Sequence, residues 1–118
     1  MRPPRLDRIY VGEAERVLRR WPDGFVDLCV TSPPYFQLRD YGHREQIGLE
    51  ETTTQYVRRL VRVIRQVRRV LKPTGSLYLN LGDTYRKKSL QLVPWRVASA
   101  LQREGWYLRN AIVWHKTV

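Results

Sequence analysis

Val26-Asp27-Leu28-Cys29-Val30-Thr31-Ser32-Pro33-Pro34-Tyr35 is the stretch that decides the fold. Four of its first five residues are apolar, and both ends of that run are β-branched, which predicts a buried strand over 26–30. The two prolines after it lack an N–H and fix their own φ angles, so the strand runs directly into a stiff loop. That loop offers carbonyls, a serine hydroxyl and a tyrosine ring, a combination that could hold a flat ring bearing an amine. A plain strand followed by a Pro-Pro turn is the alternative interpretation.

The residues before this stretch complete a strand, helix, strand unit of the size of one parallel crossover. A short strand is predicted over 6–11 and ends at Gly12, and a brief amphipathic helix follows over 13–18. The turn residues 21–24 then deliver the chain into the strand at 26–30.

A long amphipathic helix is predicted from about Gln55 to Leu71, with threonines 52–54 available to cap its start and Lys72-Pro73-Thr74-Gly75 ending it. Its apolar residues recur at spacings of three and four and form one core-facing stripe: Val57, Leu60, Ile64, Val67 and Leu71. Arginines cover the remaining surface, either as a solvated face or as phosphate contacts: Arg58, Arg59, Arg62, Arg65, Arg68 and Arg69.

The second half of the chain repeats the pattern, with a strand over 76–81, a helix from Pro94 to about Glu104 capped by Gly105, and a final strand over 106–116. Alternating strands and helices predict an α/β fold with a mainly parallel sheet. Ligands of such sheets gather at the carboxyl ends of the strands. If strands 26–30 and 76–81 are neighbours, Ser32 to Tyr35 and Asn80 to Asp83 lie at the same edge.

Composition limits the classes of protein. The chain has 118 residues, enough for one domain, and its 22 Lys+Arg against 11 Asp+Glu give a net charge of +11. That excess indicates a polyanionic partner such as nucleic acid, or only an arginine-rich proteome. Cys29 is the only cysteine, which rules out a disulfide framework, and we assign no metal site. We expect a cytoplasmic protein with no membrane partner, because no segment has the pattern of a signal peptide or membrane span.

Ser32-Pro33-Pro34-Tyr35 after a hydrophobic strand resembles the catalytic motif of the amino-group DNA methyltransferases. The serine form is typical of cytosine-N4 enzymes, whereas adenine-N6 enzymes more often carry aspartate or asparagine at that position, so cytosine is favoured and adenine stays open. The resemblance extends from about Ile9 to Lys116. It includes Leu38-Arg39-Asp40-Tyr41-Gly42, Leu79-Asn80-Leu81-Gly82-Asp83-Thr84-Tyr85 and Ile112-Val113-Trp114-His115-Lys116.

This resemblance implies a partial Rossmann-like fold that depends on S-adenosylmethionine. The implied reaction transfers a methyl group from that cofactor to the exocyclic amine of a flipped DNA base, in a restriction-modification or phage setting. Ser32, Pro33, Pro34 and Tyr35 would be the catalytic residues. Tyr35 would stack on the base, and the Ser32 hydroxyl and the Pro33 carbonyl would accept hydrogen bonds from the amine.

The resemblance also suggests residues around this centre. Thr31, Asp83 and Glu13 are candidates for binding the cofactor, although Asp83 is equally a turn aspartate and Glu13 equally a helix-start acid. Candidate nucleic-acid contacts, which are alternatively solvated loop residues, are Arg39, Arg86, Lys87 and Lys88.

The family's cofactor loop has the form Phe-x-Gly-x-Gly, and no Gly-x-Gly occurs in this sequence. In the permuted class that carries Ser-Pro-Pro-Tyr early, the target-recognition region and this loop come later. We therefore expect residues 1–118 to form a single, incomplete catalytic region that is inactive alone. A second chain or a C-terminal half would supply the cofactor loop. The alternatives are a catalytically inactive nucleic-acid-binding remnant and a subunit that needs a second chain for cofactor binding.

Overall fold

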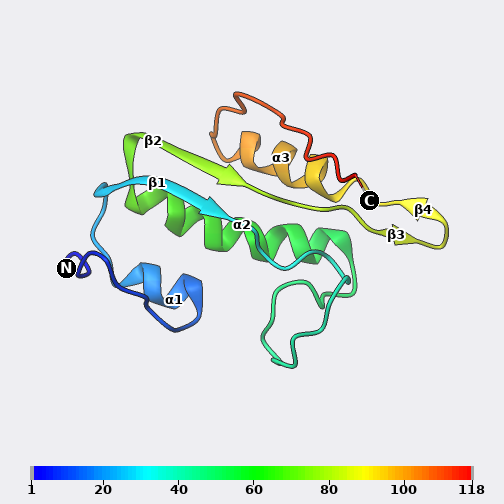
Figure 1. Ribbon diagram of the computed structural model, residues 1–118, viewed down its shortest axis with the longest axis horizontal. Helices are drawn as coiled ribbons and strands as arrows, with labels where there is room; N and C mark the ends of the chain where they lie inside the picture. Colours follow the sequence, from blue (N-terminus) through cyan, green and yellow to red (C-terminus); the bar gives the residue numbers. More distant parts are fainter. Residues whose placement is uncertain (1, 118) are drawn as a thin grey trace.

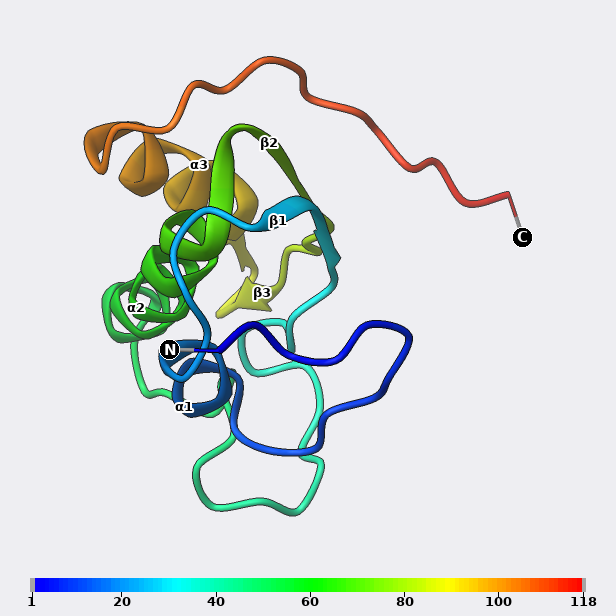
Figure 2. The ribbon, with the colours of Figure 1, turned by 90° about the vertical axis from the view of Figure 1, so that its left-hand side faces the viewer.

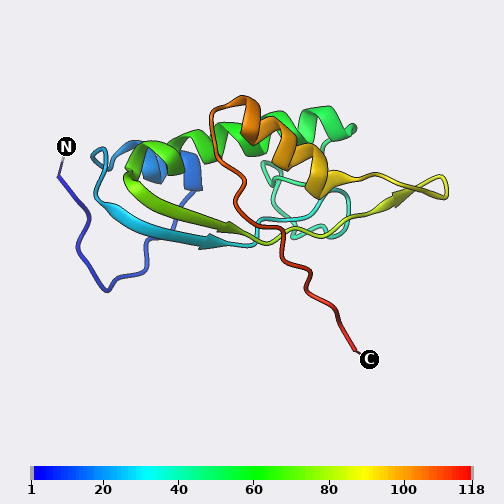
Figure 3. The ribbon, with the colours of Figure 1, turned by 90° about the horizontal axis from the view of Figure 1, so that it is seen from above.

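Strand β1, Val26–Thr31, pairs in parallel with strand β2, Leu71–Leu79, and the long helix α2, Thr53–Val70, precedes β2 directly (Figure 1). The computed structural model describes residues 2–117. Two shorter helices, α1 at Ala14–Arg19 and α3 at Val93–Arg103, lie with α2 on one face of the sheet (Figure 3). The predicted α/β class and the parallel pairing of the two strands are confirmed.

The register of the two strands is irregular at its start. Val26 pairs with Leu71, but Leu28 pairs with Ser76, so residues 72–75 stand opposite Asp27 alone. This corrects the prediction of a turn over 72–75 with the strand starting at Ser76. The chain enters the sheet at Leu71, as soon as the helix ends, and the extra residues form a bulge-like irregularity. Within it the Lys72 ammonium pairs with the Asp27 carboxylate at 2.8 Å.

Helix α2 begins with a capping box. The Gln55 N–H donates to the Thr52 hydroxyl at 3.1 Å, and the Thr52 N–H donates to the Gln55 side-chain oxygen at 3.3 Å. The helix therefore starts two residues earlier than predicted. Most of its predicted stripe is buried, but Val57 is only half-buried. The buried residues of the helix are Tyr56, Leu60, Val61, Ile64, Val67 and Val70.

The core lies between α2, α3 and the covered face of the sheet, where Leu77 and Leu79 of β2 pack against it. On the other face Leu28, Val30 and Tyr78 are 51%, 70% and 55% exposed. The prediction of a buried strand over 26–30 is therefore right for one face only, because the three helices cover a single face of the sheet (Figure 3). Cys29 faces the helices and is half-buried, and this burial raises the pKa of its thiol.

The arginines of α2 were predicted either to be solvated or to contact phosphates. Arg69 instead binds neighbouring groups of the protein. The Arg69 guanidinium donates to the carbonyls of Leu18 and Trp21 at 2.7 and 2.8 Å and to the Asp23 carboxylate at 2.6 Å. It thereby fastens the end of α1 and the following turn onto α2. The predicted helix over 13–18 is confirmed with a shift of one residue.

Two predicted strands are wrong. Residues 6–11 and 106–116 are irregular, with Ile9 94% and Val113 83% exposed, and both segments run outside the helix and sheet layers (Figure 2). β-branched composition predicts a strand only where a hydrogen-bonding partner exists, and neither segment pairs with β1 or β2. The helix that was predicted before Gly105 is confirmed, and Gly105 takes the left-handed φ of +101° that this cap requires.

A small antiparallel hairpin replaces the predicted basic loop. Strand β3, Tyr85–Arg86, pairs with β4, Ser89–Leu90, and Lys87 and Lys88 form its tip with φ angles of 49° and 69°. Two successive positive φ angles are those of a type I′ turn. Within the described residues, no helix is both long and apolar enough to cross a bilayer.

Candidate active site

The two predicted segments meet at one edge of the sheet. Because β1 and β2 are parallel neighbours, Ser32 to Tyr35 and Asn80 to Asp83 both leave the sheet at its carboxyl edge. The Asn80 N–H donates to the Thr31 carbonyl at 2.9 Å, which continues the ladder one residue beyond β2. The side chains that follow are thus placed by the sheet itself, which is more rigid than a loop.

Three side chains form a polar cluster at this edge. The Asn80 amide nitrogen lies 3.3 Å from the Ser32 hydroxyl and 3.2 Å from the Tyr35 phenol oxygen, and those two oxygens are 3.4 Å apart. Ser32 is exposed, so its hydroxyl can reach a bound molecule. The Asn80 amide takes one lone pair of the Ser32 hydroxyl, and when that hydroxyl donates its proton to the phenol oxygen, its second lone pair stays available for a ligand.

The Tyr35 ring lies against the backbone of Gly82. A Cβ at position 82 would come within 2.6 Å of the ring, closer than any side chain tolerates. The ring therefore requires glycine there, and this fixes one side of the space beside the cluster.

Tyr56 of α2 holds the proline loop from behind. Its hydroxyl donates to the Pro34 carbonyl at 2.8 Å, and its ring, fully buried, packs on Phe36 at 5.6 Å. Burial, with smaller effects of Glu50 and Tyr35, raises the pKa of the Tyr56 phenol, which stays protonated as a donor. Among residues 2–117 the Pro33 carbonyl accepts no hydrogen bond, so of the two proline carbonyls it is the one available to a ligand.

Sequence reasoning missed Tyr56. The stripe Tyr56, Leu60, Ile64, Val67 and Leu71 has spacings of 4, 4, 3 and 4, which suit a helix as well as the stripe built on Val57. The sequence therefore contained a signal for Tyr56, but the stripes that begin at Val57 and at Tyr56 fitted a helix equally well.

The segment 36–50 forms neither helix nor strand, and it folds back on the proline loop. The Gln37 N–H donates to the Gly48 carbonyl at 2.6 Å, and a Cβ at Gly48 would come within 2.7 Å of the Tyr35 carbonyl. The buried Gln46 amide accepts from the Tyr41 N–H and donates to the Arg39 carbonyl, both at 2.7 Å. These bonds make the loop an ordered support for the cluster.

The residues predicted to bind the cofactor already have structural partners. The Asp83 carboxylate accepts from the Thr84 and Val93 N–H groups at 2.9 and 3.0 Å, which ties the end of β2 to the start of α3. The Glu13 carboxylate accepts from the Glu15 and Arg16 N–H groups and caps α1. Glu13 thus makes the helix-start bonds of its alternative interpretation, whereas Asp83 makes a long-range bond to Val93 in place of a turn bond, and Thr31 contributes its carbonyl to Asn80.

The predicted nucleic-acid contacts differ in how far they project. The Arg86 guanidinium donates to the Glu51 carbonyl at 2.7 Å and stands 5.7 Å over the Phe36 ring, so it packs the hairpin onto the loop. Lys87 and Lys88 at the hairpin tip and Arg39 in the loop are exposed. Their roles, like those of the catalytic and cofactor residues, stay predictions.

The sequence pattern of the DNA methylase family, which covers N6 and N4 enzymes, matches residues 26–118. This chain belongs to that family. The match includes the whole cluster of Ser32, Tyr35 and Asn80, and the predicted resemblance to amino-group methyltransferases is confirmed.

Individual relatives agree. Over 92% of this chain, it is 46% identical to the type II methyltransferase M.SfiI of Streptomyces fimbriatus and 44% identical to M.XycI of Xanthomonas campestris pv. cyanopsidis. It spans 30% and 46% of their lengths, respectively. Among solved structures, the cytosine-N4-specific PvuII DNA methyltransferase matches 80% of this chain with a TM-score of 0.63 and 26% identity, and the chain covers 33% of it. This supports the partial Rossmann-like methyltransferase fold.

Proposed function

We propose that this chain is the base-binding part of a DNA methyltransferase that modifies the exocyclic amine of cytosine. The observation that carries the proposal is the cluster of Ser32, Tyr35 and Asn80 at the carboxyl edge of β1 and β2. The serine form of the motif and the cytosine-N4 specificity of the PvuII enzyme both favour cytosine over adenine. The type II names of the relatives support a role in restriction-modification.

The cluster suits a flat base that carries an amine. The Ser32 hydroxyl and the Pro33 carbonyl would accept the two N–H groups of the amine, while the Tyr35 ring would stack on the face of the base. Both acceptors are held by rigid neighbours, since Asn80 fixes the serine and Tyr56 fixes the proline loop. Holding the amine in this way orients its nitrogen for attack without a covalent intermediate on the enzyme. Cys29 lies within β1 and not in the loop, consistent with that route.

The methyl donor implied by the family is S-adenosylmethionine, whose sulfonium supplies the transferable methyl group. The residues of this chain fit that cofactor only in part. Asp83 and Glu13 already cap backbone N–H groups, and the sequence contains no Gly-x-Gly. We therefore assign the main cofactor site to residues outside this sequence, supplied by a further segment or by a second chain.

The exposed face of the sheet supports this assignment. Parallel strands are normally covered on both faces, and here Leu28, Val30 and Tyr78 are open on one. The remaining candidate function, a nucleic-acid-binding remnant, is favoured by the net charge of +11 and by the lack of a Gly-x-Gly in this sequence. A Phe-x-Gly-x-Gly segment encoded downstream, in the same or an adjacent frame, would support the enzyme over the remnant.

The test is a hybrid enzyme in which this chain replaces the matching part of M.XycI. We expect mass spectrometry of nucleosides from methylated duplex DNA to show N4-methyldeoxycytidine. Ser32→Ala and Tyr35→Ala should each lower turnover roughly 100-fold or more, because the amine loses an acceptor or the base loses its stacking surface. Ser76→Ala, the same chemical change at an exposed position of β2, should leave turnover unchanged.

Circular dichroism should show that all three variants keep the fold. Near wild-type methylation by Ser32→Ala or Tyr35→Ala would refute the assignment of the cluster. N6-methyldeoxyadenosine as the only product would refute the choice of cytosine and keep the reaction class.

A further inference from the structure

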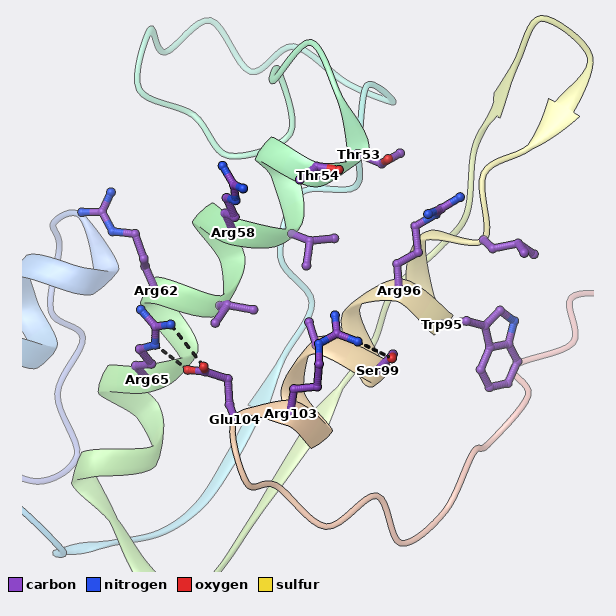
Figure 4. A pocket seen from close by; sticks show the side chains of 14 residues that line it. Thr53, Thr54, Arg58, Arg62, Arg65, Trp95, Arg96, Ser99, Arg103 and Glu104 are labelled. Carbon is purple, nitrogen blue, oxygen red and sulfur yellow. Dashed lines mark hydrogen bonds and ion pairs between the residues drawn. The ribbon is translucent and has the colours of Figure 1, made fainter.

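A groove of 880 Å³ runs between α2 and α3 on the helical side of the molecule, and residues of the active-site cluster do not line it (Figure 4). Its apolar lining includes Val57 and Val61 of α2 and Ala100 of α3. Leu92 and Trp95, at the start of α3, are 46% and 58% exposed. An exposed tryptophan beside an apolar lining is typical of a surface that another molecule covers.

Arginines from both helices surround this apolar lining. They are Arg58, Arg62, Arg65, Arg96 and Arg103, and Glu104 is the single acid that lines the groove. The difference of five arginines and one glutamate is a charge of +4. Arg65 binds Glu104 through two hydrogen bonds, so that acid mainly compensates Arg65.

Among the described residues, three of the other four arginines have no acidic partner. The Arg96 and Arg103 guanidiniums donate to neutral acceptors, the Gln91 carbonyl at 2.8 Å and the Ser99 hydroxyl at 2.9 Å. Arg62 forms an ion pair with both carboxylate oxygens of Glu15 at 3.4 Å, whereas Arg58 makes no hydrogen bond or ion pair among the described residues. The groove therefore combines an apolar lining with a positive rim.

These features distinguish between possible occupants. A second copy of this chain carries the same net charge of +11 and is repelled. A DNA duplex offers phosphates to the rim, but no apolar surface to cover Trp95, Leu92 and Val57. An amphipathic helix with acids on both sides of its apolar stripe satisfies the rim and the lining together.

The dimensions agree with a helix. Helix α3 has 11 residues, so the groove beside it is roughly 16 Å long at about 1.5 Å per residue. That length takes about three turns of a partner helix, with apolar anchors at helical spacing.

We propose that the groove between α2 and α3 docks an acidic amphipathic helix of a partner protein, with Trp95 as the anchor and Arg58 and Arg96 as its charge contacts. This docking is independent of the methylation chemistry, because none of the three residues belongs to the active-site cluster.

The test is a display selection in which random 12-residue peptides are selected for binding to the full 118-residue chain. Peptides that also bind the double variant Arg58→Glu/Arg96→Glu are removed. We expect the enriched sequences to place apolar residues at helical spacing with acids beside them. A synthetic peptide of this kind should bind at least tenfold more weakly to Arg58→Glu/Arg96→Glu and to Trp95→Ala. The control Arg8→Glu/Arg109→Glu changes the charge equally at two exposed positions outside the groove, and it should bind within twofold of wild type.

Circular dichroism checks the fold, and Trp95→Ala keeps the test valid if the double charge reversal does not fold. The proposal is overturned if the enriched peptides lack acids or helical spacing, or if both charge-reversal pairs lose equal affinity. It is also overturned if a 20-base-pair duplex loses more affinity for Arg58→Glu/Arg96→Glu than for the control pair, since the groove would then bind phosphates. Dimers in sedimentation that Trp95→Ala dissociates would instead assign the groove to a second copy.

Discussion

The ring of Tyr35 lies directly on Gly82, so close that a methyl group at position 82 would stand 2.6 Å from Cε2 and 2.8 Å from Cδ2 of that ring. The same ring carries the phenol oxygen that accepts from Asn80. The position of the stacking surface in the proposed base pocket therefore depends on a residue without a side chain, 47 positions further along the chain. Gly82, which follows β2, thus helps to determine the geometry of the loop after β1.

Gly82→Ala should displace the Tyr35 ring and weaken methylation by the hybrid enzyme at least tenfold. The half-buried ring can move toward solvent, so the loss of stability should be only about 1 kcal/mol. Turnover and urea unfolding measure the two effects. In a double-mutant cycle, Gly82→Ala added to Tyr35→Ala should cost little more than Tyr35→Ala alone. Full additivity would show that Gly82 does not act through the ring.

Thr52→Ala should destabilise the fold by about 1 kcal/mol, because α2 loses the hydroxyl that accepts the Gln55 N–H at its first turn. Thr54→Ala removes a hydroxyl that has no such role and should change stability by less than about 0.5 kcal/mol. Urea denaturation followed by circular dichroism compares the two. Equal effects of the two substitutions would argue against the capping box as a source of stability.

The central unit could be predicted from the sequence because its signals are local. The stripe at three- and four-residue spacing predicted α2, and a helix between two successive strands favours the parallel arrangement that β1 and β2 have. That arrangement in turn placed Asn80 beside Ser32. The polar cluster follows from topology more than from any single motif.

The errors arose where structure depends on a distant partner. Residues 6–11 and 106–116 have strand composition, but a strand forms only against another strand, and that partner cannot be read from the segment itself. The β3–β4 hairpin was missed because its tip, Lys87-Lys88, lacks the Asn-Gly chemistry of type I′ turns. The cap that Glu13 makes was among the alternatives, since carboxylates beside helix starts often cap them, whereas the bond of Asp83 to Val93, ten residues further along, was not.

Tyr56→Phe should make the fold less sensitive to high pH. The ordinary pKa of the phenol is 10.0, and burial raises it in the folded chain, so the unfolded chain loses this proton first. The stabilising contribution of the group is therefore complete below about pH 10 and declines as the pH rises further. Between about pH 9 and pH 11, wild type should lose more stability than Tyr56→Phe. At neutral pH the variant should be about 1–2 kcal/mol less stable, because the Pro34 carbonyl loses its donor.

Urea unfolding at each pH measures this difference. Tyr107→Phe, at a position that is 89% exposed, is the matched control and should follow the wild-type curve. Parallel curves for wild type and Tyr56→Phe would contradict the buried, hydrogen-bonded phenol.

The hairpin tip offers a test of DNA contact in which stability and binding should change in opposite directions. Lys87 and Lys88 adopt φ angles of 49° and 69°, which cost non-glycine residues roughly 1–2 kcal/mol each. Lys87→Asn/Lys88→Gly restores the residues that this turn prefers and should stabilise the fold by about 1 kcal/mol. If both lysines contact phosphates, the same change should weaken DNA binding and lower the slope of log affinity against log salt by about 2.

Fluorescence anisotropy with a 20-base-pair duplex at several salt concentrations measures that slope. The control Arg8→Gln/Arg109→Gln removes two charges elsewhere on the exposed surface and should leave the slope nearly unchanged. A stabilised hairpin with an unaltered slope would make Lys87 and Lys88 a solvated turn and remove them from the DNA interface.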